Sequence, residues 1–274
     1  MNSRFLCASA AAMVAAVAGT AFGQVYTITD GNSSAHFDTT TASTRVGMDS
    51  WVVDGVNHMY NQWFWFRTDG MTSEARLGSL TLGPSGTTDT DFDGGQDTLV
   101  LNYTGAGFTV QARFGLQGGA MGSRVSDITE QLSITNTSAA PRTFSFFQYA
   151  DFDLNNDIQD DVAQVLNANA VMQADFLSGT TVSETVFTPT FSLSEINVFP
   201  TTVNALDDAG ITNLNGSSGP LPGRQDYTWA LQWNFTLNPG ETFLISKDLQ
   251  ITPTPGAAAL LGLGGLAGLR RRRR

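Results

Sequence analysis

The stretch Tyr227-Thr-Trp-Ala-Leu-Gln-Trp-Asn-Phe-Thr-Leu237 decides the fold. Its large apolar residues occupy every second position, and smaller or polar residues stand between them. Because successive side chains of a strand point to opposite faces, this alternation predicts a β-strand with one apolar face. Residues 108–116 and 243–251 follow the same period. The sequence therefore indicates a series of half-buried strands.

Turn signals separate these strands, whereas helical signals are scarce. Asn238-Pro-Gly240 follows the first strand, and a Pro-containing turn over residues 136–141 separates two apolar runs, which predicts a hairpin. We expect one short helix, over residues 203–209. Short strands with Gly-rich turns predict an all-β fold, an antiparallel β-sandwich of about twelve or more strands with little helix.

The chain is strongly acidic, with 14 Lys and Arg against 25 Asp and Glu. Arg4 and the five C-terminal arginines lie in terminal segments with the character of targeting signals. Without them, 8 basic residues face all 25 acidic ones, a net charge of −17. Such a surface repels phosphate backbones and excludes a nucleic-acid-binding protein. The 18 Phe and 5 Trp residues are enough for a packed core.

Residues 1–23 have the organisation of a secretory signal peptide. Arg4 precedes an apolar run over residues 5–17, and small residues end the segment at Gly23, after which we expect cleavage. Cys7 is the only cysteine. The exported part, expected to be a single β-sandwich domain over residues 24–252, therefore contains no disulfide and no thiol nucleophile.

Residues 253–274 form a tail of three parts. A Pro-Thr-Pro-Gly motif is followed by an apolar stretch over residues 257–269 and by five arginines. The stretch is short for a permanent membrane span, and basic residues stay on the cytoplasmic side, so we expect a transient membrane segment. A plain tail anchor is the alternative. The motif consists of Pro253, Thr254, Pro255 and Gly256, and the arginines are Arg270, Arg271, Arg272, Arg273 and Arg274.

This tail resembles the PEP-CTERM sorting signal of Gram-negative bacteria, although the family usually has Pro-Glu-Pro where this chain has Pro-Thr-Pro. The resemblance implies processing by signal peptidase and by an exosortase-type membrane protease, and export to the cell surface or the extracellular space. It also implies a link with exopolysaccharide and biofilm. Residues 59–67, 134–136 and 147–153 are similar to segments of uncharacterised secreted proteins with this tail, which implies no activity.

Two series of acidic residues are candidates for calcium. Residues 89–94 fit the pattern Asp-x-Asp-x-Asp-Gly, in which alternating carboxylates converge on a hard cation. Val100 stands where an EF-hand has its bidentate Glu, and a solvated acidic turn is the alternative. The expected ligands are Asp89, Asp91, Asp93 and Asp97 in the first series, and Asp151, Asp153 and Asp157 in the second.

Two groups of residues are candidates for carbohydrate chemistry. Asp151 and Asp153 share one face of a strand, so they could serve as acid and nucleophile for a glycosidic bond. Trp63 and Trp65 lie in an aromatic run and could form a stacking platform for a sugar ring. Burial of both rings in the core is the alternative.

The sequence contains no Gly-x-Ser-x-Gly elbow, P-loop or dinucleotide fingerprint. The leading hypothesis is therefore a non-enzymatic β-sandwich protein of the cell surface or extracellular matrix, with no catalytic residues. The first alternative is a carbohydrate-binding module that uses Trp63 and Trp65. The second alternative is a polysaccharide-degrading enzyme that uses paired carboxylates.

Overall fold

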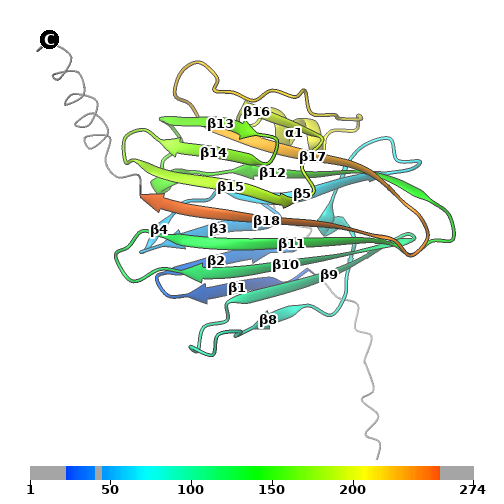
Figure 1. Ribbon diagram of the computed structural model, residues 1–274, viewed down its shortest axis with the longest axis horizontal. Helices are drawn as coiled ribbons and strands as arrows, with labels where there is room; N and C mark the ends of the chain where they lie inside the picture. Colours follow the sequence, from blue (N-terminus) through cyan, green and yellow to red (C-terminus); the bar gives the residue numbers. More distant parts are fainter. Residues whose placement is uncertain (1–22, 41–44, 254–274) are drawn as a thin grey trace, which may run out of the picture.

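The computed structural model describes residues 23–40 and 45–253, which form two antiparallel sheets of nine strands each (Figure 1). The predicted all-β sandwich is confirmed. Sheet 1 has the order β1-β2-β3-β5-β12-β17-β16, with β4 paired to β3 and β6 to β5. Its strands are β1 (Val25–Asp30), β2 (Ser33–Asp38), β3 (Gly47–Val53), β4 (Val56–Asn57), β5 (Asn61–Thr68), β6 (Ala75–Arg76), β12 (Arg142–Asp151), β16 (Leu193–Val198) and β17 (Tyr227–Leu237).

Sheet 2 has the order β13-β14-β15-β18-β11-β10-β9-β7, and β8 pairs with β9. Figure 1 shows this sheet from β8 at the bottom to β13 near the top. Its strands are β7 (Thr81–Leu82), β8 (Gly86–Thr88), β9 (Thr98–Gly105), β10 (Phe108–Gly118), β11 (Ser126–Asn136), β13 (Asp161–Asn167), β14 (Ala170–Asp175), β15 (Thr180–Thr188) and β18 (Thr242–Pro253).

The hairpin predicted across residues 136–141 is wrong. The strands on either side of this turn, β11 and β12, belong to different sheets, and so do β17 and β18 around residues 238–240. Turn residues mark a reversal of the chain but do not say whether the flanking strands pair or pack face to face. Asn136 links these two connections between the sheets, because its side-chain amide donates to the carbonyls of Ala140 (2.8 Å) and Leu237 (2.9 Å).

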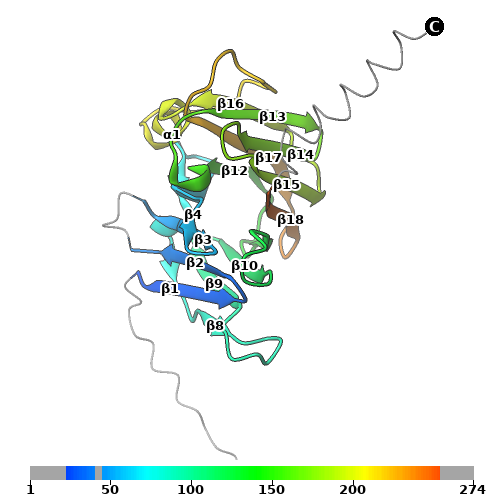
Figure 2. The ribbon, with the colours of Figure 1, turned by 90° about the vertical axis from the view of Figure 1, so that its left-hand side faces the viewer.

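The part of sheet 1 that contains β5, β12 and β17 is covered on its outer face. The helix α1 (Thr201–Asp207) lies close to the predicted range and packs against β16 and β17. In Figure 2 it lies on the side away from β14, β15 and β18. The indole N–H of Trp65 in β5 donates to Asp207 Oδ1 of this helix at 2.9 Å. As a result, most residues of β5, β12 and β17 are buried whichever face they point to.

Sheet 2 leaves its outer face open to solvent. In β10 and β11 buried residues alternate with less buried or exposed ones, as expected for strands with one wet face. The outward positions of β11 are polar, from Asp127 to Thr135. A soluble ligand can therefore approach the backbone of sheet 2 over a broad polar surface, which sheet 1 does not offer.

The interior between the sheets contains a buried ionic group as well as aromatic rings. The Lys247 ammonium lies 2.6 Å from Glu130 Oε2 and 3.4 Å from Glu184 Oε1, and all three side chains are fully buried. Gln62 from sheet 1 donates to Glu130 at 2.6 Å, and Gln148 donates to Glu184 at 2.7 Å. Because hydrogen bonds from one sheet satisfy charges on the other, this group links the two layers.

Candidate functional site

The solvent-facing side of sheet 2 contains an open hollow of about 490 Å³. Small-molecule sites in proteins have volumes of about 300–1,000 Å³. Strands β10 and β11 form its floor, and the end of β1 and the loop between β8 and β9 border it. Its lining includes Asp30, Asp91, Arg113, Gly115, Asp127 and Thr129.

Asp127 in β11 lines this hollow, and Asp248 of the adjacent strand β18 lies close enough to act on its pKa. Thr129 pairs with Asp248 and Asp127 with Gln250, so the two acids lie on one diagonal of the outward face. Burial and the charge of Asp248 raise the pKa of Asp127 to about 7. The pair thus retains a proton near neutral pH, as a general acid must.

Gly115 leaves room beside the carboxyl pair. It pairs with Thr129 in β11, which in turn pairs with Asp248 in β18, so the three residues form a row across the sheet. A Cβ atom at position 115 would lie 2.8 Å from Thr129 Oγ1. Any side chain here would therefore fill part of the floor. Arg113, two residues along β10, is exposed on the same face and adds a positive charge to the lining.

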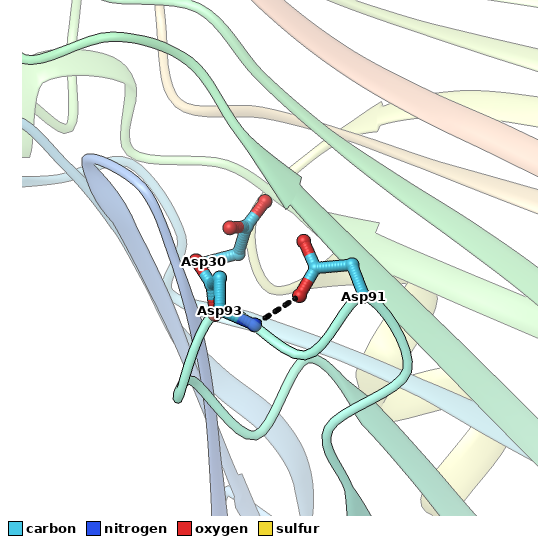
Figure 3. A group of neighbouring side chains, drawn as sticks. All are labelled: Asp30, Asp91 and Asp93. Carbon is cyan, nitrogen blue, oxygen red and sulfur yellow. Dashed lines mark hydrogen bonds between the residues drawn. The ribbon is translucent and has the colours of Figure 1, made fainter.

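The acidic loop predicted to bind calcium borders the hollow. Its carboxylates bind the loop's own backbone. Asp89 accepts hydrogen bonds from the N–H groups of Phe92 (2.6 Å) and Gly94 (3.0 Å), and Asp91 accepts one from Asp93 (3.2 Å; Figure 3). Two sets of acids here have oxygens within 4.8 Å of one another and could hold a metal ion, Asp30–Asp91–Asp93 and Asp89–Asp91–Asp97.

Asp97 anchors this loop to the sheet. Burial acts to raise its pKa, but hydrogen bonds from the Thr90 and Thr98 hydroxyls and from backbone N–H groups hold the pKa of Asp97 below its usual value. At the end of β1, next to this loop, Asp30 Oδ2 accepts the N–H of Gly118 at 2.6 Å. A Cβ atom at Gly118 would lie 2.0 Å from the Asp30 carbonyl oxygen, so only glycine permits this contact between β1 and β10.

Phe92 presents an aromatic ring to solvent in the same loop. It is 89% exposed and has a φ of 66°. A bulky residue rarely adopts the left-handed region, and here the hydrogen bond from its N–H to Asp89 holds it there. An exposed ring next to Asp91 of a polar hollow offers an apolar face on which a flat ligand can stack.

Trp63 and Trp65 are both fully buried and present no face to solvent. The ring of Trp63 stacks at 6.4 Å from that of Phe114 in sheet 2. The Trp65 ring is covered by the guanidinium of Arg76, 5.3 Å from its centroid, and by α1. In this structure both rings belong to the packing of the sandwich, which is the alternative foreseen for them.

The second predicted calcium series is only partly brought together. Asp151 and Asp153 lie in one group, whereas Asp157 lies outside it and accepts the N–H of Gln159. The third member is Asp226, which the sequence did not indicate because only the pairing of β12 with β17 brings it near. Asp151 is 1% exposed. A sugar chain has no direct access to it, in contrast to the pair on sheet 2.

The predicted signal peptide and sorting tail fall on residues 1–22 and 254–274, which lie outside the described residues. Of the residues named for them, Gly23 precedes β1 and Pro253 ends β18. Within residues 23–40 and 45–253, no helix is long and apolar enough to cross a membrane.

No family model matches this chain, and no curated protein matches it either. Solved structures of similar fold exist. A bacterial glucoamylase complexed with acarbose has a TM-score of 0.53 at 9% identity, over 89% of this chain and 34% of that one. A GalM/aldose epimerase homologue from C. elegans has a TM-score of 0.48 at 8% identity, over 84% and 98%. The GH92 α-mannosidase from Bacteroides thetaiotaomicron has a TM-score of 0.38 at 10% identity, over 87% and 32%. This chain spans about a third of the glucoamylase and of the mannosidase.

These comparisons contradict the prediction of a non-enzymatic surface or matrix protein, and with it the prediction that the chain is not an enzyme. A solved structure with this sandwich is that of a bacterial glucoamylase. The error came from treating the lack of a short catalytic motif as a lack of activity, although carboxyl pairs assembled across strands leave no such motif. At this level of identity the likeness establishes the fold alone, so the chemistry has to come from the hollow itself.

Proposed function

We propose that this protein is a carbohydrate-processing enzyme that cleaves a neutral polysaccharide at the hollow on sheet 2. The observation that carries the proposal is Asp127, a carboxyl group in the lining of a solvent-open hollow, with a second acid, Asp248, diagonally next to it on the adjacent strand. With a pKa of about 7, Asp127 can donate a proton near neutral pH. The fold, shared with a glucoamylase, is compatible with this function.

Glycosidic cleavage requires a proton donor at the glycosidic oxygen and a second carboxylate at the anomeric carbon. Asp127 gives its proton to the glycosidic oxygen, which keeps the electron pair of the breaking C–O bond. Another carboxylate of the acidic lining stabilises the positive charge that develops at the anomeric carbon. Water then adds its hydroxyl to that carbon and returns a proton to Asp127, which restores the acid.

The charges of the hollow favour a neutral sugar chain. Asp30, Asp91, Asp97 and Asp127 line it together with Arg113, so the lining is acidic overall. Uronate or sulfate groups would be repelled, whereas the hydroxyls of a neutral glycan can donate hydrogen bonds to these carboxylates.

The open face of sheet 2 is long enough for an extended chain. A second hollow of about 350 Å³ lies farther along β9, β10 and β11 on the same face, and its lining includes Asn102, Gln111, Ser133 and Thr135. From Thr109 to Gln117, β10 runs for about 27 Å at the usual rise of a strand. We place additional sugar residues of the polymer along this surface.

The experiment that tests the proposal measures reducing ends released from a panel of neutral and acidic polysaccharides at pH 6. The wild-type protein should release them from a neutral polymer, and Asp127→Asn should not, although its retardation in a gel cast with that polymer persists. Asp208→Asn, an exposed acid beyond α1, is the matched control and should keep the wild-type rate. Release of reducing ends by Asp127→Asn at the wild-type rate would show that Asp127 takes no part in the reaction.

We further propose that the protein acts outside the cell. The signal peptide ending at Gly23 and the Pro253-to-Arg274 tail support export, with signal peptidase and an exosortase-type membrane protease as processing partners and a transient membrane association. An exported enzyme would meet exopolysaccharide outside the cell, so we propose exopolysaccharide as its substrate. Mass spectrometry of the exported protein tests this: chain ends at Gln24 and near Pro253 are expected, and an intact tail would contradict sorting.

A further inference from the structure

Three carboxyl groups meet where β12 ends and β17 begins. The last pair in the register of these strands is Asp151 with Thr228; Asp153 follows this pair by two residues and Asp226 precedes it by two. Asp151 and Asp153 point to the same face, because they are two residues apart. Each of the three acids offers an oxygen within 4.8 Å of the other two. The sheet therefore builds the group from residues far apart in the sequence.

The oxygens of this group lack the partners that buried oxygens normally have. Asp151 is 1% exposed; its Oδ2 accepts the hydroxyl of Tyr149 at 2.9 Å, and its Oδ1 has no hydrogen-bond partner in the described part of the chain. Oδ1 of Asp226 and Oδ1 of the neighbouring Asp161 are likewise unpaired among the described residues. Because a buried, unsatisfied carboxylate oxygen is costly, each of these atoms calls for a ligand.

The surrounding charges do not balance the group. The group brings three carboxyl groups together, and Arg45 is a positively charged residue whose charge acts on Asp153. Arg224, the residue next but one before Asp226, interacts instead with Asp160, at 3.9 Å. Extra positive charge between the carboxyl groups would be stabilising.

We propose that Asp151, Asp153 and Asp226 bind a calcium ion. Carboxylate oxygens suit hard cations, and ligands on opposite sides of Ca²⁺ lie about 4.6–5.2 Å apart, against about 4.0–4.2 Å for Mg²⁺. Oxygens within 4.8 Å of one another are close enough to share one such ion. A hollow of about 330 Å³ that includes Asp226 in its lining gives the ion a path from solvent.

The ion would join the end of β12 to the start of β17, next to the buried rings of Phe152 and Trp229, which stack at 5.1 Å. Because calcium binds the folded arrangement and not the unfolded chain, it stabilises the fold. This site is independent of the proposed hydrolysis, which takes place on the other sheet.

The first test is thermal unfolding of the purified protein with EDTA, with calcium chloride or with magnesium chloride at millimolar concentration. We expect calcium to raise the Tm by several degrees, magnesium to raise it less, and EDTA to reverse the rise. An unchanged Tm in calcium would overturn the proposal.

Two variants locate the ion. Asp226 is half-buried, so Asp226→Asn should fold, and we expect it to lose the calcium-dependent rise in Tm. Asp91→Asn removes a carboxylate from the exposed loop and should retain the rise. The reverse result, with the rise lost in Asp91→Asn and kept in Asp226→Asn, would place the ion in the loop and overturn the assignment.

Terbium luminescence gives a readout that does not depend on stability. The phenol of Tyr149 is hydrogen-bonded to Asp151, so a terbium ion held by this carboxylate lies close enough for sensitised emission. Emission should appear on titration with terbium, disappear on addition of calcium, and require at least tenfold more terbium in Asp226→Asn. Equal titrations of wild type and Asp226→Asn would contradict the proposal.

Discussion

The two sheets each carry a crowded group of carboxyls, and the groups differ in what stabilises them. On sheet 2, Asp127 and Asp248 are diagonal neighbours on an open polar face. On sheet 1, Asp151, Asp153 and Asp226 lie at a covered strand end, where Asp151 is 1% exposed and Asp151 and Asp226 each have an oxygen without a partner in the described residues. A proton satisfies the first group. The second group needs a cation.

This difference follows from the faces on which the groups lie. A polar face in contact with water allows a proton to enter and leave, which is what acid catalysis requires. A covered strand end excludes the substrate and favours a permanent ligand. Carboxyl groups of one residue type thus take different roles according to the layer that covers them.

The largest expected effect separates the two groups by activity. Asp127→Asn should lower the rate of hydrolysis by about 10²–10⁴-fold, because it removes the proton donor. Asp153→Asn, in the other group, should leave the rate within about twofold of wild type in the presence of calcium. Rates of reducing-end release at saturating polymer test both. If only Asp153→Asn lost activity, with an unchanged Tm, the result would show that the group on sheet 1 is the catalytic one.

A smaller effect is expected at the floor of the hollow. Gly115→Val places methyl groups against Thr129 beside the pair and should lower kcat/KM by about ten- to a hundredfold through misplacement of the sugar. Steady-state kinetics measure this loss. The matching control is Gly86→Val: this glycine also lies in a strand, its φ is not positive either, and no atom lies within 4 Å of a Cβ there, so the variant reports the general cost of replacing a strand glycine by valine. Equal losses in both variants would show that the floor does not hold substrate.

The pH dependence sharpens the comparison. Hydrolysis should fall by about tenfold per pH unit above pH 7, as Asp127 loses its proton. Because the folded state raises the pKa of this acid, its contribution to stability is fully present below pH 4 and is lost as the pH rises through about 7. The Tm of Asp127→Asn should therefore decline less than that of wild type between pH 4 and pH 7. Identical declines would mean that Asp127 holds no extra proton.

The smallest effect is expected at the rim. Phe92→Ala should raise KM by about two- to tenfold and leave kcat unchanged, because it removes a stacking surface and no reacting group. Met121→Ala, a substitution of another exposed apolar residue, serves as the control. An unchanged KM in Phe92→Ala would limit the substrate to the hollow itself.

Local alternation was enough to predict the strands but not their partners. Tyr227–Leu237 is a strand with the predicted bounds, whereas the turns at residues 136–141 and 238–240 connect different sheets. Two strands joined by a turn can pair or can pack face to face, and both arrangements bury an alternating apolar face. Which of them forms depends on contacts with the remaining strands, which a short window of sequence does not contain.

The candidate site was harder to predict for the same reason. Asp127 and Asp248 each occupy an outward position of a strand, where a single acid is typical of a solvated surface. Only the register of β11 with β18 makes them a pair. Asp226 joins Asp153 in the same way, through β12 and β17. The buried ionic group between the sheets did leave a signal in the sequence, because Lys247 interrupts the apolar face between Ile245 and Leu249.

Lys247 is the single lysine of the chain, and it is buried between the sheets. Amine-directed reagents should therefore modify the folded protein only at its N-terminal amine. A second modification would require the two layers to separate, so the rate of labelling at Lys247 reports how often the sandwich opens. For the same reason, coupling to an amine-reactive surface would attach every molecule by one end and leave the open face of sheet 2 free.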